Sequence, residues 1–380
     1  MGRVAHVAAR QTGCLILVAI AGNVAGQASI ADIGDLPGGS YNSTVEAISA
    51  DGRTAVGRSI DDLGRVSFRW TPSEGIQSIG VIPGNTSPRD QANAVSADGT
   101  VIVGQTRGVN EEAFIWTAAG GVQGLGDLTP TIQRSRAFGV SDDGSVVVGF
   151  AQSASGQEAF RWTAAGGMQG LGDLPGGSFS SRSNAISGDG QVIVGNSVSA
   201  NGTEAFRWTA AGGMQPLGDL PGAGFLSSAE ATNIDGSVIV GSSLSAQGSE
   251  AFRWTESDGM QGLGFMPAST STPFTAATDT TADGSIIVGN GSSGDGVAAF
   301  LWTDSDGMRP LQDVLQADFG LDLGGWTLTA AKGISANGAV ITGTGINPSG
   351  QVSSWVVAIP APSTAALLGL AGLAATRRRR

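Results

Sequence analysis

The sequence predicts an all-β fold, a seven-bladed β-propeller of four-stranded blades, on three observations. Tryptophans recur at a spacing of 46 residues (Trp70, Trp116, Trp162, Trp208, Trp254) and continue at Trp302 and Trp355. Each lies in a copy of one phrase, which is fullest as Ala-Phe-Arg-Trp-Thr-Ala-Ala-Gly-Gly-Met-Gln at residues 159–169 and 205–215. Four short strand-like runs, bounded by turn residues, accompany every tryptophan. A period of about 40–50 residues built from short strands is typical of a repeat architecture.

Residues 171–216 represent one repeat. We expect strands at residues 184–187, 192–195, 205–209 and 214–220, because Val, Ile, Phe and Trp favour pleated surfaces and Gly, Pro, Asn or Asp bound each run. Asp-Gly joins the first two strands at 51, 98, 143, 189, 235 and 283, with Asn-Gly at 337. These pairs form tight turns. Aligned carboxylates could bind Ca²⁺, but no copy has the alternating acidic ligands of a calcium loop. We therefore predict turns and no metal site.

Counting the strands predicts a closed ring. The first three strand types each occur seven times. The fourth also occurs seven times, but one copy, at residues 30–36, precedes all the others, and the chain ends its last repeat at the strand of Trp355. In a propeller, the N-terminal strand would join the last blade and close the ring. The alternative is a β-solenoid, which would need capping elements at both ends.

Both ends of the chain differ from the repeats. Residues 1–28 hold Arg3 and Arg10, an apolar run at 14–22 and then small residues, which is the pattern of a secretory signal peptide. Residues 29–359 form the propeller. Residues 360–380 begin with Pro360, Ala361 and Pro362, continue with an apolar run and end in four arginines, which favour the cytoplasmic side of a membrane. The alternatives are a buried core helix for the first segment and a single-span anchor for the last.

Two resemblances follow from these residues. The tail at 360–380 resembles the bacterial PEP-CTERM sorting signal, although Ala361 stands where that motif has glutamate. The phrases Ala-Phe-Arg-Trp, Leu-Gly-Asp-Leu and Ile-Ser-Ala-Asp-Gly, over residues 30–357, resemble HAF-type bacterial extracellular repeats. The resemblances imply an exported protein of the cell surface or extracellular space, with the export machinery and an exosortase as partners. They also imply transient inner-membrane anchoring by the tail, and they bring no catalytic residues.

Composition excludes several classes of function. Removing both end segments takes away six of the 20 basic residues and none of the 32 acidic ones, which leaves 14 against 32 and a formal charge near −18. Such a charge opposes binding to nucleic acid or anionic membranes. His6 and Cys14 leave with the signal peptide, so residues 29–359 can build no Ser-His-Asp triad, cysteine nucleophile, zinc tetrahedron or haem ligand. We predict no catalytic, cofactor or metal site; a carboxylate pair is the remaining enzymatic option.

The loops that precede the first strand of each repeat, and those between its second and third strands, share one face of a propeller and differ most between repeats. Variable loops on a rigid scaffold usually carry function. The candidate ligand-binding residues there are Tyr41, Arg89, Arg134, Arg136, Phe179, Arg182, Phe225 and Phe274. Trp326 is a further candidate, in an irregular segment at 315–332 that either caps the ring or spaces the last blade. Ordinary solvated loops are the alternative for any single residue.

Asp in the Leu-Gly-Asp-Leu phrase and Arg before Trp in the following repeat vary together. Where Asp is replaced, by Val81 or Phe265, the Arg is replaced as well, by Ile115 or Leu301; Asp313 and Ser354 break the rule. Covariation suggests contact, and Arg offers a carboxylate a bidentate partner. We predict structural inter-blade salt bridges Asp35–Arg69, Asp127–Arg161, Asp173–Arg207 and Asp219–Arg253. A catalytic role is disfavoured because the pair occurs four times around a ring.

The sequence therefore favours a non-enzymatic, exported surface or matrix protein that binds a polysaccharide or another protein. The main alternative is a propeller-fold carbohydrate hydrolase or lyase that uses carboxylates. A third is a structural component of the envelope with no discrete ligand.

Overall fold

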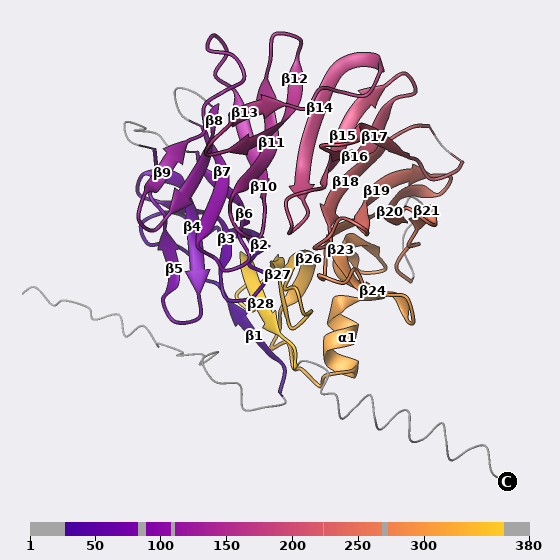
Figure 1. The fold of residues 1–380 in the computed structure, drawn as a ribbon. Coiled ribbons are helices and arrows are strands. Elements are labelled where there is room, and N and C mark those ends of the chain that lie inside the picture. Colours follow the sequence, from indigo (N-terminus) through magenta and orange to yellow (C-terminus); the bar gives the residue numbers. More distant parts are fainter. Residues whose placement is uncertain (1–26, 83–88, 108–110, 223, 268–272, 361–380) are drawn as a thin grey trace, which may run out of the picture.

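The computed structural model describes residues 27–82, 89–107, 111–222, 224–267 and 273–360. These residues form 28 strands and one helix. The strands make seven antiparallel four-stranded units around a central axis (Figure 1), so the predicted seven-bladed β-propeller is confirmed and the solenoid is excluded. Blades 3 and 4 belong to one sheet because a single parallel bridge, between Gln157 and Ser180, joins them. The proposed signal peptide and the sorting segment lie almost wholly outside the described residues.

Strands follow one another from the axis outward in each blade. The innermost strands of blades 1 to 7 are β2 (Thr44–Ile48), β6 (Gln91–Val95), β10 (Ser135–Val140), β14 (Gly176–Ile186), β18 (Ser227–Thr232), β22 (Thr275–Thr280) and β26 (Thr327–Ile334). The second strands are β3 (Ala55–Asp61), β7 (Val101–Arg107), β11 (Val146–Gln152), β15 (Ile193–Ser199), β19 (Ile239–Ser245), β23 (Ile286–Ser293) and β27 (Val340–Ile346). The third are β4 (Gly64–Thr71), β8 (Glu111–Thr117), β12 (Gln157–Thr163), β16 (Thr203–Thr209), β20 (Gly248–Thr255), β24 (Gly296–Thr303) and β28 (Val352–Ala358). The outer strands of blades 1 to 6 are β5 (Gly75–Ser78), β9 (Gly121–Gly124), β13 (Gly167–Gly170), β17 (Gly213–Gly218), β21 (Gly259–Gly262) and β25 (Gly307–Pro310).

The outer strand of blade 7 is β1 (Ser29–Asp32), from the other end of the chain. It pairs antiparallel with β28, and the register runs from Ser29 opposite Ala358 to Asp32 opposite Trp355. In Figure 1 the indigo β1 lies against the yellow β28. The predicted closure of the ring is therefore confirmed, although the strand spans residues 29–32 rather than 30–36.

The repeated phrase builds the core between neighbouring blades. Its phenylalanine, on the third strand of blades 1 to 6, is at most 1% exposed and packs against the second strands of its own and the adjacent blade (Phe68, Phe114, Phe160, Phe206, Phe252, Phe300). Burying such a ring stabilises the fold by about 1.5–3 kcal/mol. The glycine of the Val-Ile-Val-Gly phrase allows the innermost strand to approach closely, since a Cβ on Gly195 would lie 2.0 Å from the Arg182 carbonyl oxygen.

The Asp-Gly turns lie on one face of the ring, which we call the turn face. The opposite face, with the connections from second to third strands and between blades, is the loop face. In the first turn Asp51 Oδ1 accepts hydrogen bonds from the Ser49 hydroxyl (2.6 Å) and the Arg53 N–H (2.9 Å). Hydrogen bonds of this kind hold the pKa of Asp98 and Asp143 below the usual value. These carboxylates therefore stabilise turns, as the sequence predicts.

A circle of backbone hydrogen bonds joins all seven blades at the turn face. In each blade, a backbone N–H at or next to the Asp-Gly or Asn-Gly turn donates to a backbone carbonyl beside the same turn of the following blade, at N···O distances of 2.9–3.4 Å. The donor and acceptor residues are Asp51 to Ala97, Ala97 to Asp142, Asp142 to Gly188, Asp189 to Ile234, Ile234 to Ala282, Ala282 to Ala336 and Ala336 to Ala50. The last of these closes the circle. The ring is therefore held at the axis as well as at the β1–β28 seam.

The irregular segment after blade 6 is part of the core. Helix α1 (Leu311–Ala317) buries Leu311, Val314 and Leu315. Trp326 is only 8% exposed and packs in the same cluster. The helix contacts β24, β25 and β26, so the segment spaces the last blade, and the prediction of Trp326 as a ligand-binding residue is wrong. Within the described residues, no helix is long and apolar enough to cross a membrane.

The predicted Asp–Arg salt bridges are also wrong. None of the ion pairs among the described residues joins Asp35 to Arg69, Asp127 to Arg161, Asp173 to Arg207 or Asp219 to Arg253. The strand directions explain why. Each of these aspartates follows an outer strand, where the chain reaches the loop face, whereas the arginine lies near the end of a third strand, towards the turn face. Arg69, for example, pairs with Glu74 in its own outer turn.

The Leu-Gly-Asp-Leu segment does contact the following blade, but through its second strand. The backbone N–H groups of Leu36, Leu174 and Leu220 donate to the hydroxyls of Ser59, Ser197 and Ser243, at 3.1, 2.9 and 3.0 Å. Asp35 accepts a hydrogen bond from Ser59. The predicted inter-blade contact thus exists with a serine as the partner.

Candidate functional site: an arginine sector beside a ring of bulge residues

Every innermost strand contains a β-bulge at the same place. The pairing with the second strand skips one residue in each blade, and these seven bulge residues form what we call the bulge ring: Glu46, Asn93, Phe138, Asn184, Glu230, Thr278 and Lys332. A bulge re-aims the side chain of its extra residue and is frequent beside functional sites. The bulge ring therefore sets seven side chains around the axis at one level.

Three members of the bulge ring tie neighbouring blades together. The Asn93 amide donates to the Ala137 carbonyl (2.7 Å), the Asn184 amide to the Ala229 carbonyl (2.9 Å) and the Thr278 hydroxyl to the Ala331 carbonyl (3.0 Å). The acceptor has the same place in each following blade. Glu46, Phe138, Glu230 and Lys332 make no such bond, so the fold does not require their chemistry for this contact.

Charges from three separate blades meet at the axis. Burial raises the pKa of Glu46, while the charges of Lys332 and Arg58 lower it. Burial likewise raises the pKa of Glu230, which the Ser228 hydroxyl, Arg182 and Lys332 counteract. Glu46, Glu230 and Lys332 hold the same bulge position in the innermost strands of blades 1, 5 and 7, so the three residues lie at one level around the axis. The Glu230 carboxylate accepts a hydrogen bond from Ser228 at 2.7 Å, and Glu46 accepts one from Gln91 at 3.0 Å.

The sequence reasoning missed the bulge ring. The sequence does contain a signal for it. The positions on either side of the bulge residue are mostly Ala, Ser, Thr or Gly, whereas the bulge position itself holds acidic, amide, hydroxyl, aromatic or basic residues in different blades. Lys332 is also the only lysine of the chain. A position that loses its repeat identity inside a regular strand is a sign that something other than packing selects the residue.

The second feature is an uneven distribution of arginine. Of the 13 arginines in residues 29–359, seven lie on the loop face or the innermost strands, all in blades 1 to 4; we call these the arginine sector: Arg58, Arg65, Arg89, Arg107, Arg134, Arg136 and Arg182. The other six lie near the turn face, on third strands or in turns (Arg53, Arg69, Arg161, Arg207, Arg253, Arg309). A protein of strong negative charge thus concentrates positive charge on one part of one face.

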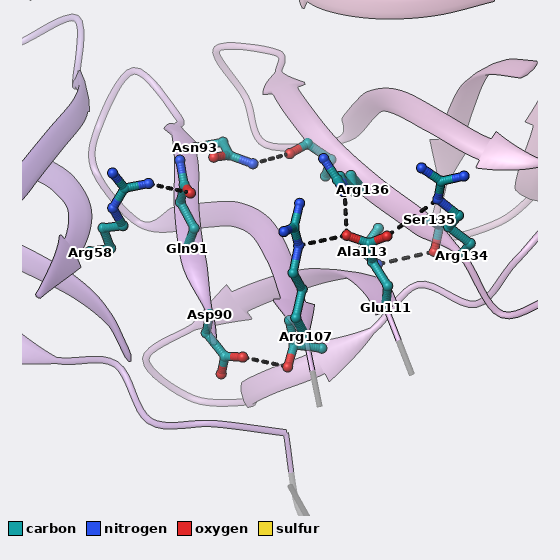
Figure 2. Close-up of polar contacts among 12 residues, drawn as sticks. Arg58, Asp90, Gln91, Asn93, Arg107, Glu111, Ala113, Arg134, Ser135 and Arg136 are labelled. Carbon is teal, nitrogen blue, oxygen red and sulfur yellow. Dashed lines mark hydrogen bonds and ion pairs between the residues drawn. The ribbon is translucent and has the colours of Figure 1, made fainter. Parts of the chain in front are cut away.

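Glu111 organises the middle of the arginine sector (Figure 2). Its carboxylate lies 2.7 Å from Arg107 Nε, 3.4 Å from Arg134 Nε and 2.6 Å from Arg136 Nε. Burial opposes ionisation, but the hydrogen bond from Arg136 and the three positive charges hold the pKa of Glu111 below its usual value. One carboxylate faces three guanidinium groups, so this cluster keeps an excess of positive charge.

Arg58, Arg65 and Arg89 line a pocket of about 470 Å³ on the loop face between blades 1 and 2, with Asn42, Ser59, Ile60, Leu63 and Gly64. Arg58 Nη1 donates to the Gln91 amide oxygen at 2.9 Å and lies 3.9 Å from Glu46. Among the described residues, Arg65 and Arg89 form no ion pair. Burial and the charges of Arg58, Arg107 and Arg89 lower the pKa of Arg65, as expected of cations held together.

Aromatic rings connect the arginine sector to the axis. Arg134 and Arg136 lie over the ring of Phe150, at 5.7 and 5.3 Å from its centroid. Phe150 stacks on Phe138 with 5.9 Å between centroids, and Arg182 lies over Phe138 at 3.9 Å. The sequence reasoning predicted the three arginines but not these two phenylalanines. The result is a continuous stack from the loop face of blade 3 to the bulge ring.

The remaining predicted face residues are dispersed. Tyr41 belongs to the seam, where its hydroxyl lies 3.0 Å from Asp32 Oδ2 and 3.1 Å from Ser353 Oγ. Phe225 is 47% exposed on the loop face. Phe179 and Phe274 are half-buried at the start of the innermost strands of blades 4 and 6. The structure therefore brings Arg134, Arg136 and Arg182 together, places Arg89 in the adjacent pocket and leaves the others apart.

The chemistry of this assembly is that of anion binding. Guanidinium groups form charge-assisted, bidentate hydrogen bonds to carboxylates, and aromatic contacts keep their planes oriented. Among the described residues there is no group of three or more His, Cys, Asp and Glu side chains that could hold a metal ion.

Comparisons with known proteins support the fold. No family model and no curated protein matches the sequence. One chain from a structural study of two prolyl endopeptidases shares the shape at 9% identity, over 84% of this chain and 50% of its own, with a TM-score of 0.53. The oligogalacturonate lyase of Vibrio parahaemolyticus matches at 10% identity, over 88% of this chain and 97% of its own, with a TM-score of 0.51. A putative TolB of Agrobacterium tumefaciens gives a TM-score of 0.43 at 14% identity, over 59% and 80%. At these identities the likeness extends to the β-propeller fold alone.

Proposed function

We propose that this protein is an exported, non-enzymatic binding propeller whose ligand is an acidic polysaccharide, held on the loop face by the arginine sector. The observation that carries the proposal is the pocket of about 470 Å³ lined by Arg58, Arg65 and Arg89. Its cations lie together in a body whose formal charge is near −18. Keeping like charges adjacent costs free energy, and an anionic ligand would relieve that cost.

A polymer fits the arginine sector better than a small ion. The cations extend over blades 1 to 4, from the pocket through the Glu111 cluster to Arg182. A polyanion can contact several of these groups at once, and linked contacts raise the overall affinity. Exposed apolar side chains on the same face, among them Leu63 and Phe225, add surface against which sugar rings can pack.

Export is supported by the sequence of the end segments. Residues 1–28 have the pattern of a signal peptide, and residues 360–380 resemble a PEP-CTERM signal, so the export machinery and an exosortase are the proposed partners. The likeness of the repeats to HAF-type extracellular repeats points the same way. On this proposal the protein acts at the cell surface or in the extracellular matrix, after transient anchoring in the inner membrane.

The experiment is a binding panel with purified protein. Polygalacturonate and alginate are the acidic probes and dextran is the neutral control, with affinity measured by calorimetry at low salt. We expect the acidic polymers to bind and dextran not to bind. Equal binding of dextran, or no binding of either acidic polymer, contradicts the proposal.

One observation favours the enzymatic alternative. Glu46 and Glu230 are carboxylates near the axis whose pKa values are raised by burial, as general acids of carbohydrate-cleaving enzymes require. The same panel separates the two functions, because a hydrolase would release reducing ends and a lyase would release products that absorb in the ultraviolet. Sustained product release that the Glu230→Gln variant loses would replace the binding function with the catalytic one.

A further inference from the structure

The bulge ring combines structural and non-structural residues at one level of the axis. Asn93, Asn184 and Thr278 donate to the neighbouring blade, which accounts for them. Of the charged members, Glu46 accepts a hydrogen bond from Gln91 of blade 2, whereas the side chains of Glu230 and Lys332 form no hydrogen bond to a neighbouring blade within the described residues. Burying charge away from water costs free energy unless a partner compensates it, so charged residues at these positions require another explanation.

Two cations of this region lack a carboxylate partner. Within the described residues, neither the Lys332 nor the Arg182 side chain forms a hydrogen bond or an ion pair. The Arg182 guanidinium lies over the Phe138 ring, and its Nε is buried without a hydrogen-bond acceptor. Burial lowers the pKa of Arg182, and the charge of Arg136 adds to this, while Glu230 opposes it. A guanidinium pinned on an aromatic ring in this way is oriented before any ligand arrives.

The charges alternate around the axis. Glu230 interacts electrostatically with Arg182 on one side and with Lys332 on the other, and Lys332 also acts on Glu46. Cations suited to a carboxylate therefore alternate with carboxylates and amides suited to hydroxyl groups. In blade order the charged residues are Arg182 (blade 4), Glu230 (blade 5), Lys332 (blade 7) and Glu46 (blade 1), with Thr278 of blade 6 between Glu230 and Lys332.

The arginine sector reaches the axis from the loop-face side. At the turn face, the circle of backbone hydrogen bonds holds the blades together at the axis. Between the bulge ring and the turn face, residues of six innermost strands, among them Ile48, Val95, Ile186 and Ile334, and Asp142 after β10 line a cavity of about 140 Å³. On the opposite side, the stack of Arg134, Arg136, Phe150 and Phe138 leads from the arginine sector to Arg182.

We propose that the bulge ring is a second binding site, which takes one hydroxy-carboxylate unit with the chemistry of a uronic acid residue. Arg182 and Lys332 hold its carboxylate, and Glu46 and Glu230 accept hydrogen bonds from its hydroxyls. The inference rests on the proposed function for its choice of ligand, because the unit would be the end of an acidic polysaccharide whose body lies on the arginine sector. The protein would then recognise chain ends as well as charge.

The test measures binding of a monosaccharide, for which D-galacturonate is the probe and D-galactose the neutral match. Saturation-transfer NMR and calorimetry report binding to the intact propeller. We expect galacturonate to bind at least about tenfold more tightly than galactose, a difference typical of one charge-assisted contact. Undetectable binding of galacturonate, or equal binding of the two sugars, overturns the proposal.

Variants locate the site. Lys332→Gln and Arg182→Gln should each weaken galacturonate binding about tenfold or more. Lys332→Gln keeps the test valid if Arg182→Gln fails to fold, since no hydrogen bond of the fold depends on the lysine. The double variant Arg53→Ala/Arg161→Ala, which removes two positive charges near the turn face, should bind galacturonate within about twofold of the unaltered protein. Unchanged affinity in both glutamine variants overturns the site.

The same variants separate this inference from the proposed function. If galacturonate binds through Lys332 but no acidic polymer binds, the proposed function fails and the axial site stands. If polymers bind through Arg65 and Arg89 but Lys332→Gln has no effect on galacturonate, the axial site fails and the proposed function stands. Asn93→Ala is the control for a structural member of the bulge ring, because it removes the bond to Ala137 and should lower stability without a selective effect on galacturonate.

Discussion

Arg182 lies over the aromatic ring of Phe138, with its guanidinium carbon 3.9 Å from the ring centroid, and the two residues come from the innermost strands of neighbouring blades. The contact holds a cation near the axis without a carboxylate partner. It also ends the stack that begins with Arg134 and Arg136 on the loop face. The position of Arg182 is thus set by an aromatic residue that interrupts the repeat.

A double-mutant cycle measures this contact. Phe138→Leu removes the ring but keeps an apolar side chain, and Arg182→Gln removes the charge. We expect a coupling free energy of about 0.5–2 kcal/mol in chemical denaturation, the range of a cation–π contact from exposed to desolvated sites. A coupling indistinguishable from zero would show that the two side chains do not stabilise one another.

Ring closure depends on Asp32 at the end of β1. Its carboxylate accepts hydrogen bonds from Ser353 (2.6 Å), Tyr41 (3.0 Å) and the Gly34 N–H (2.9 Å). Asp32→Ala should lower the free energy of unfolding by about 1–2 kcal/mol, measured by urea titration. Asp295→Ala, in an exposed turn of blade 6, is the matched loss of one carboxylate and should change it by less than about 0.5 kcal/mol. Equal effects of the two substitutions would contradict this account of the seam.

Ser197 tests which inter-blade contact follows the Leu-Gly-Asp-Leu phrase. Its hydroxyl accepts the buried Leu174 N–H at 2.9 Å, so Ser197→Ala should cost about 1–3 kcal/mol by leaving that donor unsatisfied. Arg207→Ala should cost less than about 1 kcal/mol, because Arg207 forms no ion pair within the described chain. If Arg207→Ala costs more stability than Ser197→Ala in thermal and urea unfolding, the result would contradict this account and favour the Asp173–Arg207 salt bridge expected from covariation.

Asp279 should give the propeller a pH-dependent stability. Burial raises the pKa of Asp279 to about 6, although the N–H groups of Ile334 and Thr280 donate to its carboxylate at 2.8 Å. The folded protein then binds the proton more tightly than the unfolded chain, so this group's contribution to stability falls as pH rises from about 4 to about 6 and is constant above that. Between about pH 4 and about pH 6, the free energy of unfolding of the unaltered protein should therefore fall more than that of Asp279→Asn, and the difference should be at most about 3 kcal/mol. Parallel pH profiles of the two proteins would contradict the assignment.

The repeat made much of the fold predictable. The seven strand sets, the offset that closes the ring and the role of Asp51 and its equivalents all follow from features that recur, and recurrence averages out local ambiguity. The strand directions did not enter the covariation argument, and that is why Asp35 was paired with Arg69 instead of contacting Ser59. The prediction for Trp326 was wrong for a related reason. The residue lies outside the repeat, so no recurring pattern indicated that it packs with α1 in the core.

The candidate site was less predictable because it consists of departures from the repeat. Arg89, Arg134, Arg136 and Arg182 were identified as loop-face residues, and three of them form one connected assembly. The bulge ring was missed because a bulge is a shift of register between two strands, which the residues of one strand do not reveal. Lys332 and Glu230 come to lie at one level around the axis only when the innermost strands of their separate blades surround it.

The central claim is that the arginine sector binds an acidic polymer, and one calorimetric comparison tests it most directly. Polygalacturonate is titrated into the unaltered protein, into Arg65→Ala/Arg89→Ala, and into Arg53→Ala/Arg161→Ala, which removes the same charge away from the loop face. We predict that the loop-face variant loses affinity by about tenfold or more, that the control stays within about twofold, and that binding weakens as salt is raised from about 50 to 500 mM. Equal affinity of the two variants, or binding insensitive to salt, would contradict the account.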